Sequence, residues 1–188
     1  MRRVFDAAGP ARHALLGLLL LDGPSHGYDL ARHFAPDSAL GDVLYLGPSH
    51  LYALLTRLEK DGLIVGERQD SPSRPPRRVY RLTDAGRAIV LRWLDEPVPR
   101  PREMHLDFPL KLYIARRRNP ARAGLLVSRQ RALLESHLRR LERVGRAITE
   151  YTVGEEETFI VLMREGRIAR TRAALDWLDR CARVVGSQ

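Results

Sequence analysis

Residues 47–82 constrain the fold most, because they combine an amphipathic helix with a hairpin that follows it at once. Pro48 suits the first turn of a helix, where a missing N–H costs nothing, and Gly62 suits the left-handed position just past the end. Between them, leucines recur at i, i+3, i+4 and i+7, so one face of the helix is apolar and must be buried. These leucines are Leu51, Leu54, Leu55 and Leu58.

The opposite face of this helix is polar, and it carries cations near its C-terminal end. Its side chains are those of Ser49, His50, Tyr52, Ala53, Thr56, Arg57 and Lys60. A helix of this kind fits the DNA major groove, which is about 12 Å wide, and there it can touch base edges and phosphates together.

The hairpin is predicted to have a basic tip. We expect one strand from Leu63 to about Asp70, a return strand over 79–82, and a turn over 71–78. Prolines should stiffen this turn and keep it out of the strand ladder. Three arginines in the turn, Arg74, Arg77 and Arg78, concentrate charge where the hairpin projects furthest. Helix and basic wing together predict a winged helix-turn-helix; the alternative is an arginine-rich surface loop, since the chain has 30 Arg and two Lys.

The segments around this core predict further helices. Residues 11–21 form a compact apolar helix, too short to cross a bilayer, which takes about 20 apolar residues. No signal peptide is expected there either. Ser25 is predicted to cap the next helix, which runs over 26–34, and 37–46 connects it to the amphipathic helix. Thr83 and Asp84 then open a helix that continues through Leu94.

The second half of the chain reads as long amphipathic helices. Asn119 and Pro120 start one that reaches about Tyr151, with apolar residues at coiled-coil spacing, and another spans about 155–185. Their apolar faces predict dimerisation, although the two helices could instead pack only on each other. The residues expected at the dimer interface are Leu134, Leu138, Leu141, Val144, Ile148, Phe159, Leu162 and Trp177.

Net charge points to an anionic partner, but its distribution is uneven. The formal net charge is +9 and the pI is about 10.5. Residues 1–96 hold 13 basic and 12 acidic side chains, whereas residues 97–188 hold 19 and 11. The arginines at 139, 140, 143 and 146 are therefore open to three interpretations: a solvated face, a second DNA track or a site for an anionic effector.

Several short motifs, in this order and spacing, resemble the PadR family of bacterial transcriptional regulators. The motifs are Gly27-Tyr28-Asp29-Leu30, Leu51-Tyr52, Arg57-Leu58-Glu59 with Gly62-Leu63, and Tyr80-Arg81-Leu82-Thr83-Asp84-Ala85-Gly86. Residues 108–113 are similar to the start of that family's longer helical C-terminal region. The resemblance implies a homodimer that binds a palindromic operator, usually represses, and is released by a small effector. One branch resembles virulence activators, so the direction of regulation does not carry over.

The expected architecture is mainly α with a small β-hairpin wing: a winged helix-turn-helix DNA-binding domain over 1–96 and a helical dimerisation domain, with a potential effector site, over 97–188. Phosphate contacts are predicted for Arg57, Lys60, Arg74, Arg77 and Arg78, one of which could instead enter the minor groove. Ser49, His50, Tyr52 and Thr56 are predicted near base edges, and His26 and Tyr28 on the backbone. For the two tyrosines the alternative is partial burial with a hydrated hydroxyl.

Effector contacts are predicted for Trp93, Phe108 and Tyr113, which lie at or after the junction of the two domains; for Trp93 the alternative is a core position. The expected partners are double-stranded DNA, a second copy of the chain and a small molecule, with no membrane. Neither a cofactor nor a metal is predicted, because the six histidines lack compact ligand spacing.

Enzymes are not favoured, since Gly-x-Ser-x-Gly, Walker and GxGxxG patterns are missing. The single cysteine, Cys181, fits a reducing cytoplasm, either as an inert thiol or as an intersubunit redox pair. Another class of function left open is a winged-helix adaptor for proteins that does not bind DNA.

Overall fold

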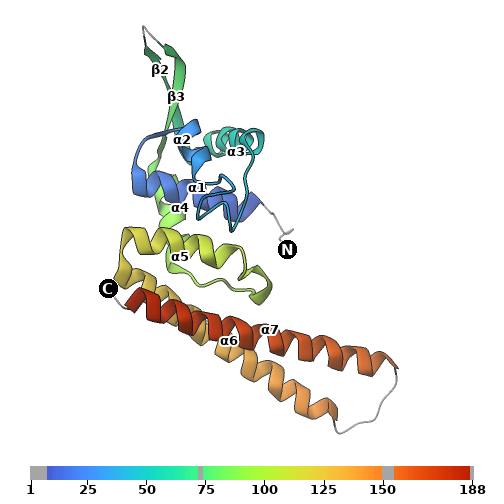
Figure 1. The fold of residues 1–188 in the computed structure, drawn as a ribbon. Helices are drawn as coiled ribbons and strands as arrows, with labels where there is room; N and C mark the ends of the chain where they lie inside the picture. The colour runs from blue at the N-terminus through green and yellow to red at the C-terminus, as the bar shows by residue number, and fades with distance from the viewer. Residues whose placement is uncertain (1–7, 72–73, 150–154, 187–188) are drawn as a thin grey trace. The chain divides into compact units, whose positions relative to one another are not determined.

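The computed structural model describes residues 8–71, 74–149 and 155–186, which form helices and one small sheet (Figure 1). The elements are α1 (Ala8–Asp22), β1 (Ser25–His26), α2 (Gly27–Arg32), α3 (Pro48–Lys60), β2 (Ile64–Ser71), β3 (Arg74–Leu82), α4 (Asp84–Asp95), the 3-10 helix η1 (Pro101–Glu103), α5 (Asp107–Arg118), α6 (Pro120–Thr149) and α7 (Glu155–Gly186). A mainly helical fold with a small hairpin is thus confirmed. The chain divides into two compact units, 1–96 with 105–118 and 97–104 with 119–188.

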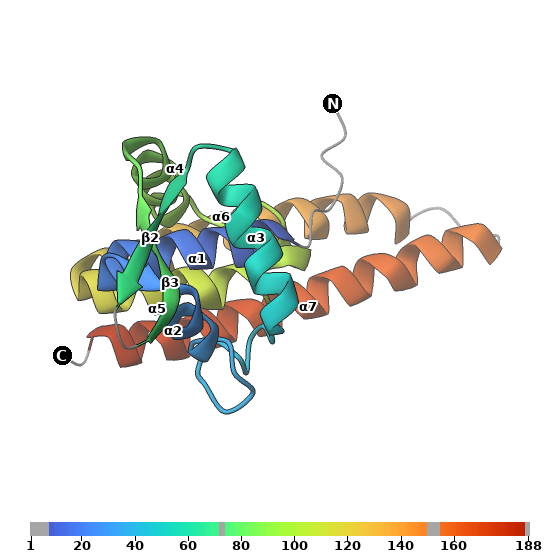
Figure 2. The same cartoon turned by 90° about the horizontal axis from the view of Figure 1, so that it is seen from above.

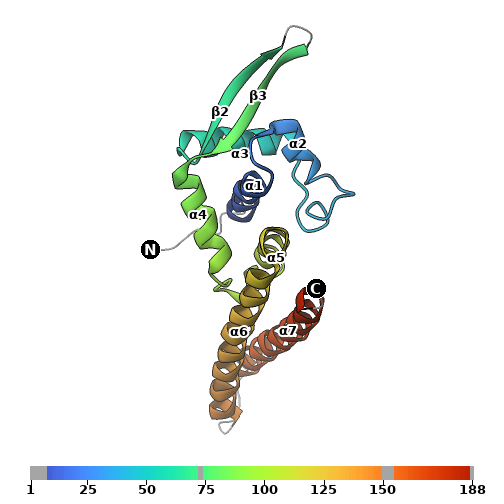
Figure 3. The ribbon, with the colours of Figure 1, turned by 90° about the vertical axis from the view of Figure 1, so that its left-hand side faces the viewer.

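Helix α1 is the centre of the first unit. It contacts α3, α4, α5 and β3, and Figure 3 shows it enclosed by the three helices. Leu15, Leu16 and Leu18 are fully buried, which explains why this segment is apolar almost all round. At Gly17 an added Cβ would lie 2.9 Å from Ile114, so the glycine allows α1 and α5 to pack closely. The predicted apolar face of α3 is confirmed, because all four of its leucines are buried.

The sheet has the strand order β1-β3-β2 and is antiparallel throughout. Its first strand was not predicted, and the prediction that Ser25 caps α2 is wrong. Ser25 and His26 pair instead with Tyr80 and Val79 of β3, so the backbone at this point belongs to the sheet. The Ser25 hydroxyl donates to the carbonyl of Gly23 at 3.1 Å, and α2 begins without a side-chain cap.

The hairpin is more regular than predicted, and the turn assigned to 71–78 is wrong. Strand β3 begins at Arg74, and Arg77 and Arg78 pair with Gln69 and Arg68 inside the ladder. The register shifts between Gln69 and Ser71, which leaves Pro75 and Pro76 opposite a single residue of β2. A bulge needs no N–H from these prolines, which is why the strand tolerates them.

Helix α4 begins and ends as the sequence predicts, and the hydrogen bonds of two side chains fix its ends. The Thr83 hydroxyl accepts from the amide of Gly86 at 3.1 Å, as expected of an N-cap, and also donates to the carbonyl of Gly62 at 2.7 Å. At the other end the buried ammonium of Lys111 donates to the carbonyls of Trp93 at 2.7 Å and Glu96 at 2.6 Å. Burial lowers the pKa of Lys111, while Asp107 and Glu96 oppose that shift.

The second unit consists mainly of α6 and α7, which pack antiparallel (Figure 1). The predicted cap at the start of α6 is confirmed, since the Asn119 side chain accepts from the amide of Arg122 at 3.3 Å. Gln130 exchanges two hydrogen bonds with the backbone of Val98, at 2.6 and 3.0 Å, and so ties the segment before η1 to α6. The predicted end of α6 near Tyr151 lies outside the described residues.

Candidate nucleic-acid interface

The polar face of α3 is exposed along the whole helix, and Figure 2 shows this helix beside the hairpin. The exposed side chains are those of Ser49, His50, Tyr52, Thr56, Arg57 and Lys60. The Thr56 hydroxyl donates to the carbonyl of Tyr52 at 3.0 Å, which leaves its oxygen free to accept another hydrogen bond. Within the described residues, Arg57 and Lys60 form no ion pair, so both cations are available to a partner.

A carboxylate at the end of α3 holds the hairpin. Oε1 of Glu59 accepts from the amide of Gly66 at 3.0 Å and from Nη2 of Arg78 at 2.6 Å. The Arg78 guanidinium also lies 5.7 Å from the ring centroid of Tyr80. We call Glu59, Gly66 and Arg78 the wing clamp, because they join α3 to both β2 and β3.

Sequence reasoning assigned Arg78 to phosphate and gave Glu59 no role. One signal was available: an acidic side chain in the last turn of a helix opposes the helix dipole, so Glu59 needs a favourable contact elsewhere. Position 66 favours glycine, because an added Cβ would lie 2.5 Å from the Arg78 side chain.

Predicted residues from four elements meet around one cavity. It has a volume of about 620 Å³ and is lined by His26, Gly27, Tyr28, Asp29, Tyr52, Arg77, Arg78 and Tyr80. Tyr28 is 69% exposed, whereas Tyr52 is 45% exposed and therefore partly buried, as the alternative for this tyrosine has it. His26 Nδ1 is buried and has no hydrogen-bond partner among the described residues. Arg77 is exposed, and the side chain of Arg74 lies outside the described part of the chain.

Gly27 brings the start of α2 against α3. An added Cβ at this glycine would lie 2.6 Å from the Tyr52 ring, so no larger residue fits without moving that ring. This close approach brings Tyr52 into the same cavity as His26, Tyr28 and Arg77. The spacing of these residues in the sequence could not reveal that arrangement.

Two of the three predicted effector residues are core residues. Trp93 is 7% exposed, stacks on the ring of His13 at 5.2 Å, and donates from Nε1 to Asp107 at 3.0 Å. Phe108 is fully buried. Burial lowers the pKa of His13 to about 4, so this imidazole stays neutral at physiological pH.

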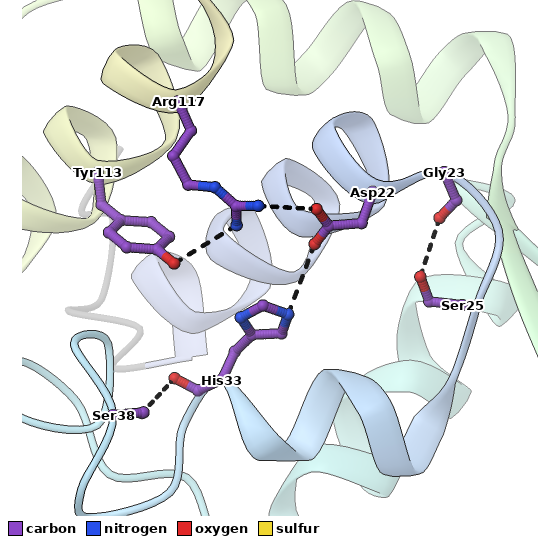
Figure 4. A network of polar contacts seen from close by, with 7 residues as sticks. All are labelled: Asp22, Gly23, Ser25, His33, Ser38, Tyr113 and Arg117. Atoms are coloured by element: carbon purple, nitrogen blue, oxygen red, sulfur yellow. Dashed lines mark hydrogen bonds and ion pairs between the residues drawn. The ribbon is translucent and has the colours of Figure 1, made fainter.

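Tyr113, the third of these residues, lines a second cavity of about 380 Å³. The other lining residues are Asp29, Arg32, His33, Ser38, Ala39 and Leu40. Figure 4 shows the polar network beside it, in which the Asp22 carboxylate accepts from Arg117 at 3.1 Å and pairs with His33 at 3.5 Å. Arg117 also lies over the Tyr113 ring, at 5.6 Å from its centroid. This network connects the ends of α1 and α2 with α5.

The predicted dimer residues fall into two groups. Leu134 and Leu141 are buried within the chain, and Leu138 and Trp177 are half-buried. Phe159 and Leu162 on α7 are 59% and 55% exposed, next to the exposed Ile160 and Met163. The side chains of Val144 and Ile148 lie outside the described part of the chain.

The described residues lack two kinds of feature. No described helix is long and apolar enough to cross a membrane. Nowhere in the described residues do three or more His, Cys, Asp or Glu side chains gather in an arrangement able to hold a metal ion.

An exposed polar helix held against a two-stranded wing defines a winged helix-turn-helix protein. Family models match both halves of the chain: the transcriptional regulator PadR-like family over residues 15–91, and the virulence activator alpha C-terminal family over 106–185. The chain belongs to the PadR-like family of transcriptional regulators, which are not enzymes.

The chain is also similar to several individual transcriptional regulators. A probable transcriptional regulator of Mycobacterium tuberculosis is 27% identical, and the match covers 92% of this chain and 96% of the relative. A PadR-like transcription factor from Bacteroides fragilis is 30% identical over 43% of this chain and 73% of its own, with a TM-score of 0.36. Bacillus subtilis PadR in complex with operator DNA is 23% identical over 93% of this chain and 98% of its own, with a TM-score of 0.45. The assignment rests on the sequence matches, not on these superpositions.

Proposed function

We propose that the protein is a homodimer that represses transcription from a palindromic operator and is released by a small-molecule effector. The observation that carries this proposal is the exposed polar face of α3 beside a hairpin that the wing clamp holds in place. Such a helix docks in the major groove while the wing follows the adjacent backbone. Two reading helices should meet half-sites about one helical turn, near 34 Å, apart.

The side chains divide by the contacts that they can make. Phosphate contacts are proposed for Arg57, Lys60 and Arg77, which are exposed cations, and for Arg74 from its place in the sequence. Ser49, His50 and Thr56 are proposed to face base edges. His26, Tyr28 and Tyr52 would hold the DNA backbone at the 620 Å³ cavity. Arg78 is instead proposed to position the wing, because Glu59 already binds it.

Dimerisation is proposed through the C-terminal region, 97–188. The exposed apolar side chains of α7 favour a second copy of the chain as their cover, since a large exposed apolar patch marks an interface. Light scattering should give twice the chain mass of 21.4 kDa. Changing Phe159 and Leu162 to Gln should yield monomer, whereas Leu125→Gln, at a position that is 56% exposed on α6, should leave the dimer intact.

The effector is proposed to bind in the 380 Å³ cavity that Tyr113 lines. Arg32, His33 and Tyr113 offer hydrogen-bond donors there, against one carboxylate, so a small anionic molecule with an apolar part fits best. Because the adjoining network joins α2 to α5, a ligand that favours one arrangement of these helices would change how α3 is presented to DNA.

Activation is the second candidate, and one observation favours it: residues 106–185 match the C-terminal family of virulence activators. Repression and activation are separated by transcription in vitro from the protein's own promoter. Transcription that falls with added protein supports the repressor, and transcription that rises supports the activator.

The first test is fluorescence anisotropy with the protein's own promoter region and a scrambled duplex across a salt series. Preference for the promoter at physiological salt is expected. Equal and steeply salt-dependent binding to both duplexes would contradict operator recognition, and no binding to either at low salt would favour the adaptor.

A further inference from the structure

Charge is divided between two flanks of the helix pair α6–α7. On one flank, carboxylates and arginines are paired: Arg131 binds Glu135 at 3.0 Å and Asp179 at 3.1 Å, and Arg172 binds Glu142 at 2.8 Å. Glu135 and Glu142 are seven residues apart and so share this flank. These opposite charges largely cancel within the chain.

The other flank is basic and has no carboxylate among its described contacts. Arg140 donates from Nη2 to Nδ1 of His137 at 2.8 Å, and these two residues, three apart, lie on one face of α6. Arg140 is two residues before Glu142, a spacing at which helical side chains do not face each other. Burial lowers the pKa of His137, and the charges of Arg140 and Arg167 lower it further. Cations of both helices therefore act on this imidazole.

Helix α7 extends this flank. Arg167 and Arg170 are three residues apart and exposed, whereas the ion-paired Arg172 is two residues beyond Arg170 and points elsewhere. We call His137, Arg140, Arg167 and Arg170 the basic flank. Neither Arg167 nor Arg170 forms an ion pair in the described part of the chain. Uncompensated cations held on two rigid helices repel one another, and a polyanion would relieve that repulsion.

We propose that the basic flank is a second, sequence-independent binding surface for the phosphate backbone of double-stranded DNA. DNA is the occupant that fits, because the flank presents guanidinium groups from two neighbouring helices, and a duplex presents closely spaced phosphates to such a row. Recognition there would be electrostatic, since the flank offers cations rather than a surface shaped to enter a groove. The surface adds affinity for any duplex and leaves operator choice to α3.

The test compares two triple variants of the full chain that lose the same charge. One changes Arg140, Arg167 and Arg170 to Gln. Its matched control changes the exposed Arg116, Arg118 and Arg183 to Gln. Anisotropy with a random-sequence duplex is measured between about 50 and 200 mM salt. The basic-flank variant should reduce the slope of log K against log salt by roughly 2 to 3, at about 0.9 per phosphate lost, and the control should reduce it by less than half as much.

Direct contact is read from the imidazole resonance of His137 in the unaltered protein, assigned with His137→Gln. It should shift when the random duplex is added. If the parent and the basic-flank variant have the same slope of log K against log salt, the proposal is overturned and the flank is a solvated face. If both triple variants lower this slope equally, the change reflects only net charge, which also overturns the proposal. If the basic-flank variant binds a hairpin RNA more weakly but binds DNA as the parent does, the flank is a site for RNA and the proposal is also overturned. Preference for the promoter over the scrambled duplex is read separately, so failure here is distinct from failure of operator recognition.

Discussion

The wing clamp gives the sharpest prediction, because electrostatics and positioning predict opposite effects on DNA binding. Replacing Glu59 by Gln removes a negative charge from the surface proposed to meet DNA, so attraction to phosphate alone would tighten binding. The same change breaks the ion pair with Arg78, which fixes β3 against α3. If the clamp positions the wing, Glu59→Gln should lower preference for the promoter while nonspecific affinity stays equal or rises.

The size of the stability effect follows from the contacts. The pair is partly exposed, 51% for Arg78 and 25% for Glu59, so its loss should cost about 0.5–1 kcal/mol. Glu59→Gln keeps an oxygen for the amide of Gly66, whereas Glu59→Ala leaves that part-buried donor unsatisfied and should cost about 1–3 kcal/mol more. Urea denaturation of the two variants measures this difference.

A double-mutant cycle isolates the pair itself. Glu59→Gln, Arg78→Gln and their combination should give a coupling energy of about 0.5–1 kcal/mol. The matched control is the ion pair of Arg81 and Glu67, which joins β3 to β2 on the same hairpin and is 55% and 60% exposed. The positioning role of the wing clamp would be refuted if two results came together: a coupling energy of Glu59 and Arg78 no larger than that of the control pair, and an unchanged preference of Glu59→Gln for the promoter.

Four further predictions concern the first unit, residues 1–96 with 105–118. Thr83→Ala should lower the free energy of unfolding by about 1–2 kcal/mol in urea titrations, because the cap of α4 is lost. Gly86→Ala should cost at least about 1–3 kcal/mol by the same assay, since the new Cβ would lie 2.0 Å from the carbonyl oxygen of Leu63. His13 has a folded pKa of about 4, below its ordinary value of 6.5, so the unfolded chain binds the proton first. Stability should therefore fall as pH drops from 6.5 towards 4, by up to about 1.4 kcal/mol per pH unit, and His13→Phe should flatten that dependence. Arg77→Gln should weaken binding to promoter and scrambled duplex alike and reduce the salt slope by about 0.9; an unchanged slope would exclude a phosphate contact.

The sequence predicted helices α3 and α4 well, because the pattern that defines each helix lies in residues that are neighbours along the chain. Leucines at helical spacing between Pro48 and Gly62 define α3, and Thr83 with Asp84 defines the start of α4. The sequence-based prediction failed where the same residue types fit two different structures. The prolines of the hairpin indicated a long turn, but a bulge accommodates them inside β3. Ser25 has the residue type of a cap, yet pairing with Tyr80 commits its backbone to the sheet.

Residue type and spacing identified the exposed face of α3, because a helix that must bury its leucines has to expose the opposite side. They could not predict that Glu59 binds Arg78, nor that Asp22 meets Arg117 and His33, because these residues are distant in the chain. Trp93 and Phe108 had the chemistry of ligand contacts, but only packing revealed them as core.

The sequence by itself determined the main helices, their apolar faces and the family of this protein, since short-range periodicity and motif order encode all three. Tertiary structure alone decided which cations are free and which are already bound. Arg77 is open to a partner, whereas Arg78 is held by a carboxylate 19 residues away, and the two are neighbours in one strand. Both side chains line the same cavity, so what each binds depends on which groups of the neighbouring elements lie within its reach, and only Arg78 meets Glu59 at the end of α3.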